Sequence, residues 1–307
     1  MRIILFSRPQ VRHVAEDVAL IFGECRRHGF QLSVNEEFSA MAGELIRAGS
    51  DGHTPEYPEW DTYGTHVGRI DGPAVMVCYG GDGTLLEGAS RLDGQPIPVA
   101  GINSGRMGFL TSSPTAGIAE IFATIARGEL QVEERTMLRV SGGFAAGGGV
   151  RYALNEAAVQ RVGATTVSVE VLVDGQSVAH CHGDGVIIST PTGSTAYSLS
   201  VGGPVVSPQC RCLVISPIAP HNLTMRPVVV PDTSRISLRL HSSAERAFCT
   251  VDNRTEQLAD GAEIEISLAE RRIFLAVAHN ISFYDTLRNK MMWGYDVRVR
   301  RPDESRQ

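Results

Sequence analysis

The sequence predicts two domains of different fold class, an α/β domain followed by an all-β sandwich domain. Up to about residue 130, apolar runs of strand length alternate with segments of helical period. Beyond that point, short stretches with a period of two residues dominate and are separated by tight turns. The chain has 307 residues, 43% of them hydrophobic, which is enough for two separate cores.

The N-terminal part is expected to form a mostly parallel sheet covered by helices. Met1–Phe6 is an apolar run that predicts a buried strand, and residues 11–27 carry apolar side chains at helical spacing. Residues 49–72 are rich in Gly, Pro, Asp and Thr, so a long mobile loop is expected there. The next elements alternate again: a strand at 73–79, a helix at 85–91, a strand at 97–102 and a helix at 114–127.

The C-terminal part is expected to be antiparallel. Valines alternate with other residues from 165 to 173, and Asp174-Gly175 then supplies the residues of a tight hairpin turn. A second hairpin is expected at Asp260-Gly261, joining strands at 249–251 and 264–266. Residues 282–292 return to helical spacing, and this helix is expected to pack back on the first domain.

The cations consist of 27 arginines and a single lysine, Lys290. A P-loop ends in Gly-Lys-Ser/Thr, and the absence of any Gly-Lys pair excludes that phosphate site. Schiff-base chemistry would depend on Lys290, which has no obvious partner in the sequence to depress its pKa. Phosphate would therefore be bound by backbone amides, a metal ion or arginine.

Charge and composition narrow the expected partners and the cellular compartment. A net charge of −6 disfavours nucleic acid as a partner, and no apolar run approaches the length of a membrane span. No signal peptide precedes the first strand, so a cytoplasmic location is expected. The six cysteines lack any Cys-x-x-Cys pair and match no usual zinc spacing, which favours free buried thiols and no protein-held metal cage.

The turn Gly80-Gly81-Asp82-Gly83-Thr84 follows a predicted buried strand and precedes a predicted helix. Glycines allow a phosphate chain to approach the backbone, and the N-terminus of the helix favours its negative charge. On its own, Asp82 fits an ordinary turn residue equally well. The turn does not match the dinucleotide fingerprint, because Leu86 stands where the third glycine belongs. Hydrolase, zincin and protein-kinase motifs are absent as well.

Five motifs in a fixed order resemble those of the NAD kinase family, over most of the chain from about residue 73 onward. They are Gly80–Thr84, GINSGRMGFL at 101–110, Asn155-Glu156, GDGVIISTPTGSTAYSLS at 183–200 and PIAPHNLTMRP at 217–227. The resemblance implies a Rossmann-like α/β domain, residues 1–108 with 283–307, and a β-sandwich NAD-binding domain, residues 109–282. It places the active site between them.

The resemblance also implies an activity, which is transfer of the terminal phosphoryl group of ATP, or of polyphosphate, to the 2′-hydroxyl of the adenosine ribose of NAD. The product would be NADP, the cofactor would be Mg²⁺ or a similar divalent metal, and the ligands would be NAD and ATP. A homodimer or homotetramer with shared NAD sites is expected from the same likeness.

The site residues are carried over one by one. Asp82 would be the general base toward the ribose hydroxyl, and Gly80, Gly81, Gly83 and Thr84 would form the phosphate loop. Asn155 and Glu156 would bind the ribose, since an amide and a carboxylate suit vicinal hydroxyls. The remaining expected NAD contacts are Gly83, His182, Asp184, Thr195, Ala196, Tyr197, Ser198, Leu199, Ser200, Ala219 and Arg254.

Three positions depart from the family pattern. His182 replaces an arginine found in many members, Arg254 stands where a glutamine is usual, and Glu87 occupies a place where some relatives have a cation. The cations left for the phosphate donor are then arginines such as Arg106, Arg226 and Arg254. Two alternative functions stay open: a lipid kinase, which shares the Gly-Gly-Asp-Gly turn, and a binding module that senses NAD(H) or NADP(H) without turnover.

Overall fold

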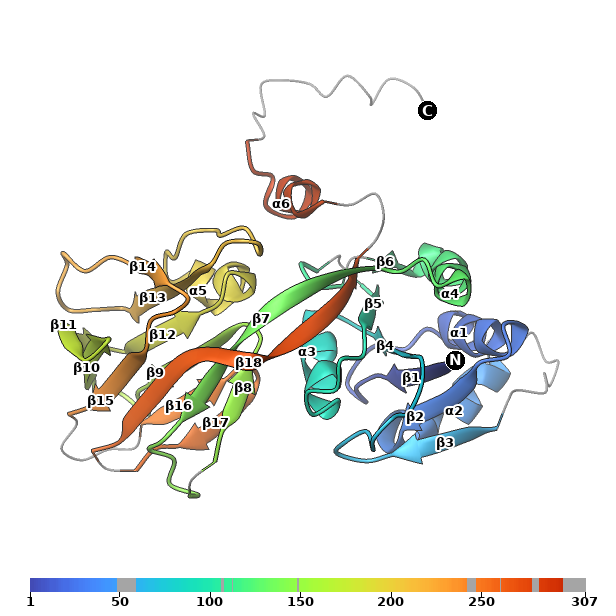
Figure 1. Ribbon diagram of the computed structural model, residues 1–307, viewed down its shortest axis with the longest axis horizontal. Coiled ribbons are helices and arrows are strands. Elements are labelled where there is room, and N and C mark those ends of the chain that lie inside the picture. The colour runs from blue at the N-terminus through green and yellow to red at the C-terminus, as the bar shows by residue number, and fades with distance from the viewer. Residues whose placement is uncertain are drawn as a thin grey trace. The chain divides into compact units, whose positions relative to one another are not determined.

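The chain forms two compact units (Figure 1). The computed structural model describes residues 1–48, 59–105, 108–111, 113–147, 149–241, 247–259, 261–277 and 282–294. The first unit comprises Met1–Gly88, Pro98–Val132 and Ala276–Gln307, and the second comprises Ala89–Ile97 and Glu133–Leu275. The domains expected from the sequence divide the chain after 108 and 282 instead.

The first unit is built on a parallel sheet with the order β5-β4-β1-β2-β3. Most of its strand residues are buried, because helices cover the sheet. Strands buried in this way have continuous apolar sequences instead of an alternating pattern. The strands are β1 (Arg2–Phe6), β2 (Gln31–Asn35), β3 (Trp60–Tyr63), β4 (Ala74–Tyr79) and β5 (Val99–Asn103), with a short β6 (Ser113–Pro114) paired to β5.

Three helices of this unit bury apolar side chains in a common core. Helix α1 packs against α2 and α4, and Phe22, Phe38 and Phe122 from these three helices are almost fully buried in that core. The helices are α1 (Ala15–Arg27), α2 (Glu36–Ala48), α3 (Asp82–Arg91), α4 (Ile118–Arg127) and α6 (Phe283–Met291), with a 3₁₀ turn η1 (Thr115–Gly117) before α4. The parallel sheet and its helices confirm the α/β fold predicted for this part.

The loop expected over residues 49–72 is wrong in part, because β3 lies within it. Trp60–Tyr63 pairs with β2 as an edge strand, and its sequence shows no apolar period because three of its four residues keep contact with solvent. Its anchors are tertiary: the Trp60 indole N–H donates to Ser39 Oγ at 2.9 Å, and the Tyr63 hydroxyl donates to Leu5 O at 2.9 Å. Residues 49–58 lie outside the described part of the chain.

The second unit is a sandwich of antiparallel strands, as predicted. One sheet has the order β14-β13-β12-β9-β16-β17. Its members are β14 (Val228–Pro231), β13 (Cys212–Ile218), β12 (Gly185–Ser189), β9 (Glu156–Gln160), β16 (Phe248–Val251) and β17 (Arg254–Gln257). Facing it are β11 (Gln176–Gly183), β10 (Val167–Val173), β15 (Ile236–Leu240), β18 (Glu263–Val277), β7 (Gln131–Ser141) and β8 (Arg151–Ala153).

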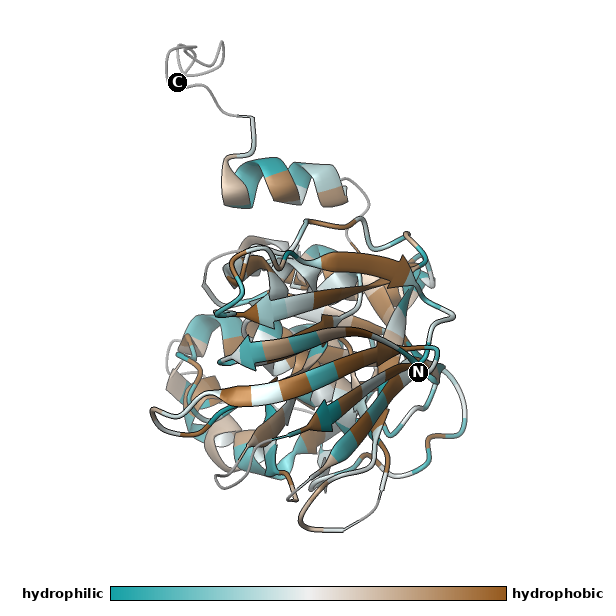
Figure 2. Ribbon diagram, turned by 90° about the vertical axis from the view of Figure 1, so that its left-hand side faces the viewer, coloured by the Kyte–Doolittle hydropathy of each residue, from teal (hydrophilic) through white to brown (hydrophobic). Residues whose placement is uncertain are grey.

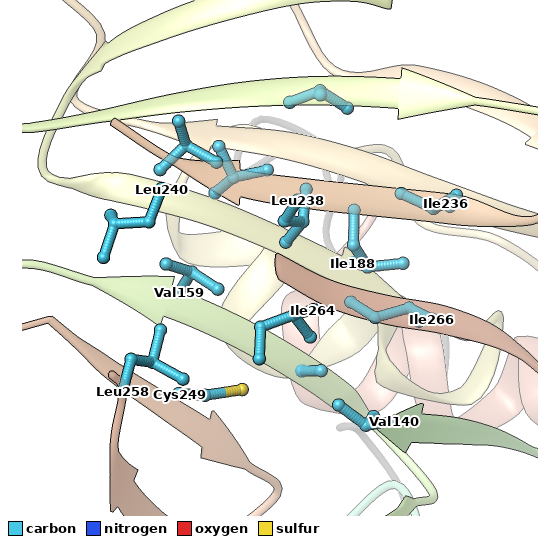
Figure 3. Packing of buried hydrophobic residues seen from close by; sticks show 14 of the residues in the cluster. Val140, Val159, Ile188, Ile236, Leu238, Leu240, Cys249, Leu258, Ile264 and Ile266 are labelled. Carbon is cyan, nitrogen blue, oxygen red and sulfur yellow. The ribbon is translucent and has the colours of Figure 1, made fainter. Parts of the chain in front are cut away.

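The core of the sandwich comes from the inward-facing residues of both sheets. Strands such as β15 alternate buried with more exposed positions. Figure 2 shows hydrophobic and hydrophilic residues alternating as brown and teal bands along strands that face the viewer. Figure 3 shows Val159 and Ile188 of one sheet among Leu238 and Ile264 of the other. Because strands such as β10 and β15 contribute alternate side chains, the core depends on register, and a slip by one residue in these strands would expose it.

One predicted hairpin is confirmed and the other is wrong. Asp174 and Gly175 have φ of 51° and 82° and connect β10 to β11 as a two-residue turn. Strand β16, however, turns at Asp252-Asn253 and pairs with β17, so 249–251 does not form a hairpin with 264–266. Asp252 tolerates the positive φ of 51° that this turn requires. Asp260 lies outside the described residues.

The cysteines are all free, and four of the six are buried. Burial raises the pKa of the Cys249 thiol to about 12 and that of Cys25 still higher, so these thiols stay protonated. Cys210 is exposed and Cys212 is partly exposed, which corrects the expectation that the thiols are buried throughout. Among the described residues, no helix is long and apolar enough to cross a membrane.

Candidate active site

The glycine turn lies at the point where the strand order of the parallel sheet reverses. The chain proceeds from β1 to β2 and β3 on one side, then returns to place β4 against the other edge of β1. Ligands of open α/β sheets bind at the carboxyl ends of strands at such a point. Gly80–Thr84 follows β4 there, and Arg8 follows β1. A Cβ on Gly83 would lie 3.2 Å from Arg8 Nη1, so this cation borders the turn.

The Asp82 carboxylate is fixed by the segment 108–111. Oδ2 accepts the backbone N–H of Phe109 at 2.8 Å, and Oδ1 accepts the backbone N–H groups of Leu110 at 3.2 Å and Thr111 at 2.9 Å. The Thr111 hydroxyl adds a further bond to Oδ1 at 2.9 Å. The close approach requires glycine at 108, where a Cβ would lie 1.7 Å from Oδ1. Asp82 is therefore held in one orientation, with 29% of its side chain exposed.

Helix α6 brings Lys290 to this carboxylate. Its helix starts at a capping box formed by Ser282 and Asp285, and its first residue, Phe283, packs its ring against Phe109 with centroids 6.4 Å apart. Lys290 Nζ lies 3.9 Å from Asp82 Oδ2 and 4.5 Å from the centroid of the Phe109 ring. The partner of Lys290 is an anion, which favours the charged ammonium, so the expectation that nothing near Lys290 prepares it for Schiff-base chemistry is not contradicted. The predicted packing of this helix on the first unit is confirmed.

The second unit contains a pair of buried acceptors, Asn155 and Glu156. Their residues are only 7% and 8% exposed, at the start of β9. No described residue donates a hydrogen bond to Asn155 Oδ1 or Glu156 Oε2. Burial, together with the neighbouring Asp252, raises the pKa of Glu156 to about 8, against the opposing effect of the backbone N–H of Tyr197. Two buried oxygens without donors indicate a site for a ligand that supplies hydrogen-bond donors.

Asp252 holds this pair in place. Its carboxylate accepts the backbone N–H of Leu154 at 2.8 Å and of Asn155 at 2.8 Å, and that of Glu156 at 3.2 Å. In return, the Asp252 backbone N–H donates to Glu156 O at 2.9 Å. Desolvation raises the pKa of Asp252 while these three N–H groups lower it. The turn between β16 and β17 thus orients the first residues of β9.

Replacing Asp252 with alanine is expected to destabilise the fold by about 2 kcal/mol, because three backbone donors lose a charged acceptor. The dissociation constant for a ligand at Asn155 and Glu156 should rise as well. Urea unfolding and ligand titration measure the two effects. Asp174→Ala is the matched control, since Asp174 has the same φ of 51° in a hairpin turn. Equal ligand affinity in Asp252→Ala and wild type would show that Asp252 has no orienting role.

The segment after β12 is hydrogen-bonded to the backbone beside Asn155 and Glu156. Thr190 donates its hydroxyl to Leu154 O at 2.6 Å and its backbone N–H to Asn155 O at 2.9 Å. Gly193 approaches so closely that a Cβ there would lie 2.0 Å from Asn155 O. The short helices η2 (Thr192–Thr195) and α5 (Tyr197–Ser200) follow, and the N–H of Tyr197 reaches Glu156. The predicted NAD-binding block and the acceptor pair therefore form one structure.

Within this block the side chains differ in what they can offer a ligand. Tyr197 packs against Ala158, Ile187 and Ile218, and a large part of its ring is thus in the core. Ser198 is fully buried, and its hydroxyl is 3.0 Å from that of Ser216, so it stabilises the fold. The Thr195 hydroxyl donates to Thr192 O at 3.2 Å. Ala196 and Leu199 are partly exposed and Ser200 is exposed.

The other predicted NAD contacts gather around the junction of β11 and β12. The carbonyl of His182 accepts the N–H of His221 at 2.8 Å, and its imidazole is exposed. Asp184 forms an ion pair with Arg161, whose Nε lies 2.5 Å from Oδ1. Ala219 adopts a positive φ of 41° at the end of β13, which is strained for a residue with a Cβ.

Two of the candidate donor-binding arginines donate hydrogen bonds to backbone carbonyls of their own unit. Arg254 donates from Nη2 to Tyr152 O at 2.7 Å, and Arg226 donates from Nη1 to the carbonyls of Leu223 and Met225. Both belong to the second unit. Arg106 lies outside the described residues.

Two family models match almost consecutive parts of the chain. The ATP-NAD kinase N-terminal domain matches residues 8–130, and the ATP-NAD kinase C-terminal domain matches residues 154–277. The NAD kinase of Bacteroides fragilis is 32% identical over 300 residues, which cover 97% of this chain and 100% of that protein. The chain belongs to the NAD kinase family. The NAD kinase of Flavobacterium johnsoniae is 36% identical over 304 residues, with the same coverage of 97% and 100%.

Solved structures of the NAD kinase family have the same fold. An NAD kinase from Archaeoglobus fulgidus in complex with ATP is 26% identical, with a TM-score of 0.69 over 95% of this chain and 99% of that chain. Yeast NADH kinase complexed with NADH has a TM-score of 0.84 over 98% of this chain and 90% of that chain, at 24% identity. The α/β and β-sandwich architecture is therefore that of the family.

The candidate site residues predicted from the sequence do not include four residues that the structure places beside them. These are Arg8, Arg161, Asp252 and Lys290. Arg8 could have been found, since it directly follows the first strand and the strand order places it beside the glycine turn. Asp252 was noted only as part of a motif that departs from the family. Lys290 carries no local signal, because it acts on a residue more than 200 positions away in the chain.

Proposed function

We propose that this kinase transfers the terminal phosphoryl group of ATP to the 2′-hydroxyl of the adenosine ribose of NAD, giving NADP. Asn155 Oδ1 and Glu156 Oε2 support this most directly, because they are adjacent buried acceptors that no described residue satisfies. Leaving a buried acceptor unpaired costs roughly 1–3 kcal/mol, so such a pair is expected to serve a ligand with two donors. The vicinal hydroxyls of a ribose are two donors at adjacent carbons.

Asp82 supplies the general base for that hydroxyl. A ribose hydroxyl is a weak nucleophile, and a positioned carboxylate accelerates proton transfer by about 10²–10⁴. The bonds from Phe109, Leu110 and Thr111 fix the carboxylate, so little reorganisation is needed when the hydroxyl arrives. The acceptor of the phosphoryl group is thus an alcohol.

The donor phosphates are bound by the glycine turn and the first turn of α3. Gly81 is exposed, with open space where a Cβ would lie, so its backbone is accessible to phosphate, and the helix begins at Asp82. Gly80 is buried, and its missing Cβ makes room for the Thr84 side chain. The backbone N–H groups of Thr84 and Leu85 donate to Gly81 O and stabilise the turn. Arg8 adds a positive charge at the same edge of the sheet.

A divalent ion such as Mg²⁺ is expected to arrive with the triphosphate. The described residues contain no cluster of three metal-ligating side chains, and Asp82 already accepts four hydrogen bonds. This donor set fits an ion bound chiefly by phosphate oxygens, which is usual for Mg²⁺ at nucleotide sites. When bound, the ion would neutralise charge on the transferred phosphoryl group.

The function is tested by incubating the protein with ATP, Mg²⁺ and NAD and measuring NADP with a dehydrogenase that accepts only NADP. Wild type is expected to form NADP, and a second arm replaces ATP with polyphosphate. NAD binding without NADP formation would indicate a sensor module. Phosphorylation of diacylglycerol but not of NAD would indicate a lipid kinase.

We further propose that the protein is a homodimer or homotetramer with shared NAD sites, located in the cytoplasm. The support for both is likeness to the family. Light scattering at working concentration gives the mass of the assembly, and a monomer mass would contradict the shared sites.

A further inference from the structure

We propose that Lys290, the single lysine of the chain, is a phosphate-binding residue for the donor: its ammonium group, next to Asp82 in the free protein, binds the terminal phosphates of ATP. This inference rests on the proposed function, since it assigns the donor phosphates to the glycine turn. It adds a residue from the C-terminal helix to a phosphate site built from the N-terminal half of the chain.

The position of Lys290 is determined by the packing of α6. Phe283 and Lys290 are seven residues apart, which is two helical turns, so both project from the same face. Thr286 and Leu287, between them, are 7% and 6% exposed. The capping box fixes where the helix starts, and the ring of Phe283 contacts Phe109. The lysine head is thereby delivered to a defined place.

The ammonium group of Lys290 lies near Asp82 but makes no hydrogen bond to it. Its distance of 3.9 Å from Asp82 Oδ2 is too long for a hydrogen bond, and that oxygen already accepts the Phe109 N–H. The Phe109 ring lies under the cation at 4.5 Å and orients it without using its N–H donors. With 38% of the side chain exposed, Nζ can turn its three donors to phosphate oxygens.

The neighbouring cation, Arg8, is in a different state. Its Nε is 2.5 Å from Glu87 Oε2, so much of its charge is balanced within the protein. Lys290 faces Asp82, the carboxylate proposed as the base. When Asp82 accepts the proton of the ribose hydroxyl, its attraction for Lys290 falls, and the ammonium is then attracted chiefly to the phosphates. Lys290 should therefore act on the donor and on the transfer step, and leave NAD affinity unchanged.

The test compares Lys290→Met, Lys290→Arg and wild type. Binding of ATP with Mg²⁺, of inorganic tripolyphosphate as a phosphate-only probe, and of NAD is measured by calorimetry, with initial rates in parallel. Lys290→Met should weaken ATP and tripolyphosphate binding by about 10–100-fold, the effect of losing a charged hydrogen bond, with NAD binding unchanged. Lys290→Arg keeps the charge and can stack on Phe109, so it should recover most of the loss.

Arg288→Met is the matched control, because Arg288 lies on the same helix and pairs with Asp285. Phe283→Ala removes the ring contact of α6 with Phe109 and should reproduce the loss of phosphate binding with Lys290 still present. Equal tripolyphosphate affinity in Lys290→Met and wild type, or an equal loss of NAD affinity, would overturn the inference. If wild type binds ATP but forms no NADP, the proposed function is wrong. The comparison of tripolyphosphate binding between Lys290→Met and wild type then still tests whether Lys290 binds phosphate.

Discussion

Asp82→Asn is expected to lower kcat for NADP formation by about 10²–10⁴, because an amide cannot accept the proton of the ribose hydroxyl. The variant should still bind NAD, since the acceptor pair Asn155 and Glu156 is unchanged. Initial rates and NAD titration measure the two quantities. Full activity in Asp82→Asn would refute the assignment of Asp82 as the base.

Because Asp82 also anchors residues 108–111, a second variant must separate the two roles. Thr111→Val removes the hydroxyl that donates to Asp82 Oδ1 at 2.9 Å and keeps the carboxylate. We expect its activity to stay within about tenfold of wild type, because Asp82 loses only one of its four hydrogen bonds. The bond from Asn103 Nδ2 to the Thr111 hydroxyl at 2.8 Å is lost as well, so urea unfolding is measured alongside activity. An equally large loss in Thr111→Val would mean that Asp82 acts by ordering this segment.

Glu156→Gln is expected to weaken NAD binding by about 10–100-fold, because the ribose hydroxyls lose a charged acceptor. ATP binding should be unaffected. Glu265→Gln, an exposed glutamate of the same unit, is the matched control. If both variants bind NAD as wild type does, the ribose does not bind at this pair.

NAD affinity should also depend on pH through Glu156. Burial raises the pKa of this carboxyl to about 8, so it is protonated at pH 7 in the free protein. The ionised form accepts from both hydroxyls, and affinity should therefore rise from about pH 6 to pH 8 and then level off. Binding at pH 7 should release a proton, which calorimetry in buffers of different ionisation enthalpy detects. Glu156→Gln should abolish both effects.

The raised pKa of Glu156 also makes the stability of the fold depend on pH. Stability should fall as pH rises, whereas NAD affinity should increase. A carboxyl with a pKa raised from 4.5 to about 8 favours folding below pH 4.5, and this contribution is lost as pH rises through 8. Above pH 8 the wild type contains a buried charge near Asp252. Glu156→Gln should therefore unfold at higher urea concentration than wild type at pH 9, although it binds NAD less well.

The elements that follow from local pattern were predictable, and those that depend on tertiary contacts were not. Buried strands such as β4 and hairpins such as Asp174-Gly175 have signals in a few consecutive residues. Strand β3 is short and polar, and it exists because Trp60 and Tyr63 find partners on α2 and β1. The turn at Asp252-Asn253 was missed because Asp-Gly at 260–261 gave the stronger local signal.

The residues of the candidate site also fall into those with a local sequence signal and those positioned by tertiary contacts. Asp82, Asn155 and Glu156 were found because they lie in motifs of contiguous residues. What fixes them was not found: Asp252 meets Asn155 across about a hundred residues, and Lys290 meets Asp82 from the last helix. The NAD contacts of Asp184 and Arg254 stay predictions. In the structure Asp184 pairs with Arg161 and Arg254 donates to Tyr152 O, contacts that sequence cannot show.

The most direct test of phosphoryl transfer to the ribose follows label from ATP. Protein, Mg²⁺ and ATP labelled at the γ-phosphate are incubated with NAD or with NAD lacking the 2′-hydroxyl of its adenosine ribose. The proposed function predicts label in the product from NAD and none in the deoxy analogue. No transfer to NAD, or equal labelling of the deoxy analogue, would contradict it.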